Sequence, residues 1–152
     1  MIRNKNKLIS KNSKPIIIAE IAQSHLGSFS KIKKMIKMIS KTGIDVIKFQ
    51  THYAEEESTL DEPFRKFISN KFKSRYDYWK KMEFSENQWI KIKACCEENN
   101  VLFLSSPFSI KAANLLKKIG LNFWKIGSGE FFSKDLIDHI IKFKDLIIIS
   151  TG

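Results

Sequence analysis

The chain has 152 residues, of which 43% are hydrophobic and 28% charged. This balance is typical of one folded domain and excludes a disordered chain. No apolar run approaches the roughly 18 residues of a membrane helix, and the N-terminus lacks the apolar segment of a secretory signal. Cys95 and Cys96 are adjacent and have no CxxC or Cys/His pattern, which argues against a disulfide or a zinc site. We therefore expect a cytoplasmic protein without membrane contact.

The net charge of +11 raises the possibility of nucleic-acid binding. Residues 1–14 hold five bases and no acid, and we expect them to form a basic flexible tail. Most other lysines are expected on solvated helix faces. The chain has only three arginines, the residue that usually reads bases through bidentate contacts. The sequence thus favours a protein that does not bind nucleic acid, while attraction for small anions stays compatible with its charge.

Strand and helix signals alternate from residue 15 onward. The apolar run at 15–22 is typical of a buried parallel strand. Ser28 or Ser30 can cap the helix that follows, and Gly43 is placed to end it. Apolar residues recur at helical spacing between them, at Ile32, Met35, Ile36 and Ile39. Residues 45–50 are expected to form the second strand.

A long insertion at 51–84 separates the second strand from its helix. Segments of this length in compact domains are often lids or binding loops. Short helices are expected at 62–67 and 76–82, and the aromatic stretch suits a sugar-binding lid. The alternative is an aromatic patch that packs on the outer surface of the fold. The notable residues are Glu55, Glu56, Glu57, Pro63, Arg65, Arg75, Tyr76, Tyr78 and Trp79.

The alternation continues to the end of the chain. Ser85 and Gln88 form a capping box before a second helix. Ser109 is expected to start a third helix that Gly120 ends, and Ser133 to cap a fourth. The remaining strands are expected at 101–106, 123–129 and 146–152. We therefore predict an α/β fold with about five parallel strands and four main helices.

Polar residues follow the apolar middle of each predicted strand. In parallel α/β folds the carboxyl ends of the strands meet at one edge, where sites are found. Two lysines, several hydroxyls and one carboxylate would form a pocket for a small anionic substrate. The residues are Glu20, Lys48, Gln50, Ser105, Ser106, Lys125, Ser128 and Ser150.

Other interpretations of these residues remain open. Lys48 and Lys125 could form a structural ion pair with Glu20, and the serines could be turn or capping residues. His25 is expected to be a hydrogen-bonding loop residue, and the other histidines are too scattered for a metal motif. The turn at 127–129 could hold an anion, but a lone GxG is a weak signal.

Five short segments resemble the sialic acid synthase family, whose members include N-acetylneuraminate, legionaminate and pseudaminate synthases. They are AEIAQSHLGS at 19–28, VIKFQTH at 46–52, FLSSPF at 103–108, KIGSGE at 125–130 and STG at 150–152. The resemblance implies an (β/α)₈ TIM barrel followed by an antifreeze-like domain. It also implies a transferase that condenses phosphoenolpyruvate with an N-acetylated aminosugar, such as N-acetylmannosamine, and releases phosphate.

The resemblance also implies roles for individual residues. Glu20 matches the carboxylate that contacts the sugar near its reacting carbonyl, while Gln50 and Glu130 match positions on the sugar or metal side. Ser24 replaces the Asn that usually precedes the loop histidine. The family positions that hold the phosphate and carboxylate of phosphoenolpyruvate are matched by Lys48, Ser106, Lys125, Ser128 and Ser150.

The chain differs from the family pattern in its extent. A complete barrel has eight strands and about 250 residues, so residues 15–152 are expected to form the N-terminal part of the barrel. The family's Mn²⁺ or Mg²⁺ is held by histidines on later strands, and no metal ligand is expected here. The family enzyme is a homodimer in which the antifreeze-like domain supplies an arginine to the neighbouring site. We expect this chain alone to be inactive.

Two alternatives to this function remain. One is a non-catalytic basic module that binds nucleic acid or another anion, for which the charge is the only argument. The other is a different phosphoenolpyruvate aldol-type synthase, such as those that make octulosonate or heptulosonate phosphates. That alternative would require additional basic residues for a second phosphate.

Overall fold

The computed structural model describes residues 14–64 and 71–152. The predicted flexible tail lies outside this part of the chain, except for Lys14. Residues 62–64 are not helical. The rest of the helix predicted at 62–67, including Arg65, lies outside the described residues.

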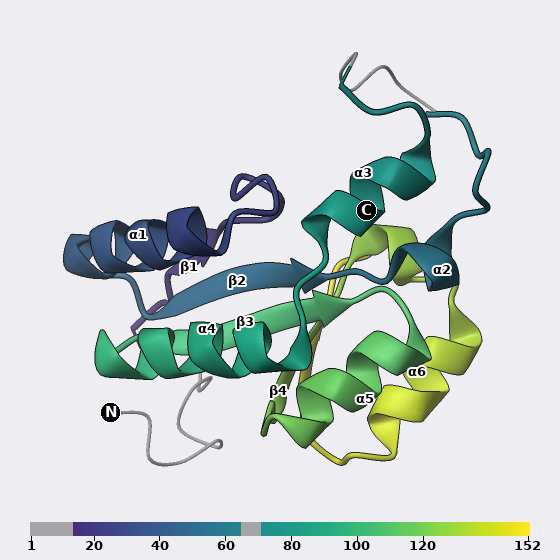
Figure 1. Ribbon diagram of the computed structural model, residues 1–152. Helices are drawn as coiled ribbons and strands as arrows, with labels where there is room; N and C mark the ends of the chain where they lie inside the picture. Colours follow the sequence, from purple (N-terminus) through teal and green to yellow (C-terminus); the bar gives the residue numbers. More distant parts are fainter. Residues whose placement is uncertain (1–13, 65–70) are drawn as a thin grey trace.

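The described residues form one five-stranded parallel sheet (Figure 1). The strands stand side by side in chain order, and each pairs in parallel with the next. Their bounds are β1 Ile18–Glu20, β2 Val46–Thr51, β3 Leu102–Pro107, β4 Phe123–Ile126 and β5 Leu146–Ile149. Sequential order with helical crossovers is the arrangement of a (β/α) barrel, so the predicted incomplete TIM barrel is confirmed.

Four main helices connect the strands, as predicted, and two short helices lie in the insertion. The main helices are α1 Phe29–Ile39, α4 Glu86–Glu98, α5 Ile110–Lys118 and α6 Lys134–Ile141. The insertion contains α2 Ala54–Glu57 and α3 Arg75–Met82, of which only α3 was predicted. Two 3₁₀ turns complete the list, η2 Ser40–Thr42 and η3 Ser128–Glu130.

Serine caps begin most of the main helices. Ser28 accepts a hydrogen bond from the Lys31 amide, Ser109 accepts one from Ala112, and Ser85 forms the predicted capping box with Gln88. The prediction for Ser133 is wrong in one respect, because its side chain makes no capping bond at α6. It donates instead to Glu130 Oε2 at 2.6 Å.

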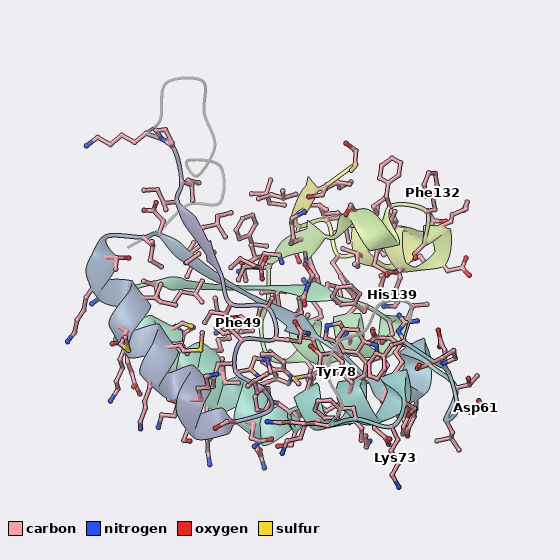
Figure 2. All side chains as sticks on the ribbon, turned by 90° about the horizontal axis from the view of Figure 1, so that it is seen from above. Phe49, Asp61, Lys73, Tyr78, Phe132 and His139 are labelled. Atoms are coloured by element: carbon pink, nitrogen blue, oxygen red, sulfur yellow. The ribbon has the colours of Figure 1, made fainter. Side chains whose placement is uncertain are left out.

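The two faces of the sheet differ in how they are covered. One face packs on the main helices through residues such as Phe49 and Trp124, and this interface is the larger core; Figure 2 shows Phe49 within it. The opposite face, which would line the barrel interior, has a smaller apolar cluster around Val46, Leu104 and Phe123. Since side chains alternate along a strand, every second residue belongs to this inner face.

No helix among the described residues is long and apolar enough to cross a bilayer.

Candidate functional site

Polar side chains gather at the carboxyl end of the inner face. Glu20 aligns with Lys48 across β1 and β2, and Gln50 aligns with Ser106 across β2 and β3. Because Ser105 is paired with Trp124, Ser106 is level with Lys125 on β4. The same alternation, continued one residue past the end of β5, adds Ser150. We call the set the polar mouth: Glu20, Lys48, Gln50, Ser106, Lys125 and Ser150.

Glu20 and Lys48 form an ion pair at the start of the mouth. Lys48 Nζ lies 2.5 Å from Glu20 Oε2, and the other carboxylate oxygen of Glu20 accepts the Ala22 amide. The Lys48 side chain is buried, whereas 47% of the Glu20 side chain is exposed. The structural ion pair that the sequence left open is therefore present for Lys48. About half of the Glu20 side chain remains accessible to a ligand, although both carboxylate oxygens already accept a hydrogen bond.

Lys125 has a different environment. Its ammonium donates to the Ile126 carbonyl at 2.9 Å and to the Ser150 hydroxyl. Burial and the nearby Lys48 charge lower the pKa of Lys125, and Glu20 partly opposes this effect. Lys125 makes no ion pair with a carboxylate among residues 14–64 and 71–152, so a bound anion would supply the missing negative charge.

The Ser106 hydroxyl is buried and has no hydrogen-bond partner within the described part of the chain. An unpaired hydroxyl in such a place costs free energy, and native proteins rarely keep one without a reason. Ser106 is level with Lys125, as the register above shows. A ligand oxygen held by Lys125 could therefore also satisfy the Ser106 hydroxyl.

Two of the residues predicted at the rim are placed elsewhere. Ser105 faces the helix-covered side of the sheet, where its hydroxyl lies 2.8 Å from that of Thr51. Its predicted place in the pocket is therefore wrong, because alternation along β3 turns it away from Ser106. Ser128 begins η3 just past β4 and is exposed.

Glu130 lines a separate open groove of about 540 Å³ between α2, α5 and α6. None of the polar-mouth residues lines this groove. Phe132, which does, is 90% exposed and points away from the ribbon in Figure 2. Of the eight residues to which the resemblance assigns a role, six belong to the polar mouth, and Ser128 and Glu130 lie outside it.

A buried histidine cluster next to the mouth was not predicted. The His52 ring is stacked between Trp79, at 4.0 Å, and Phe108, at 4.2 Å. Its Nδ1 lies 2.8 Å from Glu57 Oε2, and its Nε2 lies 3.5 Å from Gln50 Oε1. The sequence does contain one signal, since Lys48, Gln50 and His52 alternate along one face. The stacking partners had no such signal because they come from distant segments.

The insertion approaches the carboxyl end of the sheet. Helix α3 lies beyond the end of β2 in Figure 1, and it carries Trp79 onto His52. The Gly27 backbone packs against the Lys81 carbonyl, so the loop after β1 touches the end of α3. Tyr78 contacts Phe64 and Phe72 within the insertion itself. These contacts place the aromatic stretch beside the polar mouth.

The motif resemblance implies a metal, for which the described part of the chain offers no group of ligands. Residues 14–64 and 71–152 contain no group of three or more His, Cys, Asp or Glu side chains that could hold an ion. This part of the chain therefore does not fit Mn²⁺ or Mg²⁺ by itself.

Comparison with known proteins agrees with the motifs and the fold. The chain is 33% identical over 138 residues to N-acetylneuraminate-9-phosphate synthase of Drosophila melanogaster, covering 90% of this chain and 37% of that protein. It is 30% identical over 142 residues to N,N'-diacetyllegionaminic acid synthase of Campylobacter jejuni, covering 91% and 42%. The chain thus spans about 40% of the length of these curated relatives.

A solved structure supports the same conclusion at the level of fold. The N-acetylneuraminic acid synthetase of Leptospira borgpetersenii superposes with a TM-score of 0.75 at 24% identity, covering 95% of this chain and 49% of that one. The model of the NeuB family matches residues 35–152. With this match and the curated relatives, the chain belongs to the NeuB family, the sialic acid synthases that its motifs resemble.

Proposed function

We propose that this chain is the phosphoenolpyruvate-binding part of a synthase that condenses phosphoenolpyruvate with an N-acetylated aminosugar. The observation that supports this most is the polar mouth, where an unneutralised Lys125 lies level with the buried, unpaired Ser106 hydroxyl. A phosphate or carboxylate group would satisfy both.

In this proposal, different residues of the polar mouth bind the two substrates. Lys125, Ser106 and Ser150 hold the anionic groups of phosphoenolpyruvate, and Lys48 adds charge from the neighbouring strand. Glu20, half exposed and fixed by Lys48, faces the aldehyde of the sugar. In the reaction, C3 of the enol phosphate bonds to the aldehyde carbon, water adds at C2, and phosphate leaves. Mouth residues orient the two substrates for this attack.

The relatives support the sugar-acid product class. Their names describe synthases of N-acetylneuraminate 9-phosphate and of N,N'-diacetyllegionaminic acid. Both products are nine-carbon sugar acids of the sialic type. Because this chain spans only part of those proteins, the complete reaction, its aminosugar and a homodimeric assembly belong to the proposal.

Phosphoenolpyruvate binding by the 152-residue chain tests this proposal. We expect calorimetric titration to detect binding, and Lys125→Ala to weaken it at least tenfold, since a charge-assisted contact to phosphate contributes about 1.5–3 kcal/mol. Lys142→Ala, an exposed residue at the end of α6, is the matched control and should leave the affinity unchanged. Equal affinity of wild type and Lys125→Ala would contradict the proposed role.

A further inference from the structure

Two buried hydroxyl groups lie behind the polar mouth, on the helix-covered face of the sheet. Thr51 Oγ1 on β2 and Ser105 Oγ on β3 are 2.8 Å apart, and neither residue is exposed. Ser105 aligns with Phe49 and Trp124, two residues of the larger apolar core. Because a hydroxyl buried in such a layer is stable only when it is hydrogen-bonded, each of the two residues depends on the other.

Ser105 is also the residue at which three strands are joined. Within the described part of the chain, β2 and β3 are paired at six positions, whereas β3 and β4 are paired at one, Ser105 with Trp124. The last backbone bond between β2 and β3, from the Phe108 amide to the Thr51 carbonyl, is long at 3.4 Å, whereas the bond at the first residue of β3 is 2.9 Å. The bond between the two hydroxyls therefore adds a second tie where the backbone contact is long.

This tie lies where it can determine the position of the Ser106 hydroxyl. Ser106 is level with Gln50 through the register of β2 and β3. It is level with Lys125 because Ser105, its neighbour, is paired with the residue that precedes Lys125. A movement of Ser105 is passed to Ser106 through one planar peptide unit. Since binding groups must be held to within about 0.5 Å by the residues behind them, the hydroxyl bond bears on the site itself.

We propose that Thr51 and Ser105 are positioning residues, whose buried hydroxyl bond holds the Ser106 hydroxyl where it and Lys125 bind the same anionic group of phosphoenolpyruvate. The inference rests on the proposed function and adds to it two determinants of affinity that do not touch the ligand. A merely structural pair would affect binding only through stability. Variants in which stability and affinity change separately therefore test the proposal.

Thr51→Val removes one hydroxyl and keeps the branched shape of the side chain. It leaves the Ser105 hydroxyl buried without a partner, so the free energy of unfolding should fall. Adding Ser105→Ala makes both positions apolar, and this double variant should regain most of the lost stability, because no unpaired hydroxyl remains. Its affinity for phosphoenolpyruvate should not recover. We expect binding about three- to tenfold weaker than that of wild type, the loss for one weakened hydrogen bond.

Thr51→Ser is the conservative counterpart, because it keeps the hydroxyl and loses a buried methyl group. It should be less stable than wild type but should bind phosphoenolpyruvate with unchanged affinity. Urea unfolding measures the stability of each variant, and calorimetric titration measures its affinity. Thr42→Val is the matched control. It removes a hydroxyl that donates to the Ile39 carbonyl at 2.7 Å in η2, ahead of β2, and it should bind as wild type does.

The comparison of Thr51→Ser with Thr51→Val holds whether or not the double variant regains stability. If both bind equally weakly, affinity follows packing rather than the hydroxyl bond, and the inference is overturned. Wild-type affinity in the double variant would also overturn it and leave the proposed function standing. If the wild-type chain binds no phosphoenolpyruvate, the proposed function fails, and the inference fails with it.

Discussion

At the residue scale, His25 shows how burial sets the charge of a side chain near the mouth. It is 1% exposed, and its Nδ1 accepts the Gly27 amide at 3.0 Å. The sequence predicted a hydrogen-bonding loop residue, and this is confirmed. Burial lowers the pKa of His25 to about 4, with smaller contributions from the charges of His52 and Lys31. His25 is thus neutral at physiological pH.

The lowered pKa of His25 predicts a loss of stability in acid. The unfolded chain takes up a proton near pH 6.5, whereas the folded chain does so only near pH 4. Stability therefore falls as pH drops through this window, by about 3 kcal/mol from this residue. Urea unfolding at pH 7 and pH 4 should show a smaller difference in His25→Gln than in wild type. An NMR titration midpoint of His25 near 6.5 would contradict this account.

The positions of site residues could be predicted from the sequence where they alternate along a single strand. Lys48 and Gln50 alternate along β2, so their common face follows from the sequence. The contacts of His52 were not predictable, because Trp79 reaches it from a helix that lies beyond a long insertion. Glu130 lies in η3 beyond β4 and accepts a hydrogen bond from Ser133, and no periodicity in the sequence reveals this contact.

At the element scale, local signals predicted the main helices well. Ser28, Ser85 and Ser109 cap where expected, since capping depends on residues within one turn. Helix α2 was missed because its first backbone amide donates to a residue distant in the sequence. The Ala54 N–H donates to Glu83 Oε1 at 2.7 Å, a residue that follows α3. A four-residue helix held by such a contact has no cap of its own in the sequence.

Two glycines, Gly27 between β1 and α1 and Gly43 after η2, give a prediction about packing against α3. Gly27 and Gly43 both have positive φ, +70° and +80°. A Cβ on Gly27 would lie 2.0 Å from the Lys81 carbonyl oxygen, whereas one on Gly43 meets nothing within 4 Å. Gly43→Ala should therefore cost about 1–2 kcal/mol from backbone strain alone. Gly27→Ala should cost clearly more, because the end of α3 must also move.

Chemical denaturation of the two glycine variants measures this difference. Phosphoenolpyruvate affinity provides a second readout, since Gly43 is remote from the mouth and its variant should bind normally. Equal destabilisation by both substitutions would show that the loop does not pack on α3 as described.

At the scale of the whole molecule, the parallel sheet followed from the alternation of strands and helices, and the barrel from the motif resemblance. What the alternation could not determine is how the inner face is covered. Its apolar cluster includes the half-buried Ile16, Ile18, Leu102, Leu146 and Ile148. Strands β1 and β5 are the two edges of the described sheet. Exposed edges and apolar faces promote association between molecules.

We therefore expect the 152-residue chain to self-associate as its concentration rises. Sedimentation velocity should show larger species in wild type, and fewer of them in Ile148→Lys, which places a charge on the inner face. Ile141→Lys, an exposed position on α6, should behave like wild type. A single monomeric species for wild type at all concentrations would rule out this expectation.

The position of the polar mouth has one consequence for how such a chain can vary. Each side chain of the polar mouth faces inward because successive residues along a strand point to opposite faces of the sheet. Deleting a single residue ahead of Lys48 within β2 would turn the Lys48 and Gln50 side chains toward the helices and would turn Phe49 into the polar mouth. Length changes in the insertion at 51–84 leave the direction of these side chains unchanged. We therefore expect insertions and deletions to be tolerated there and not within β2.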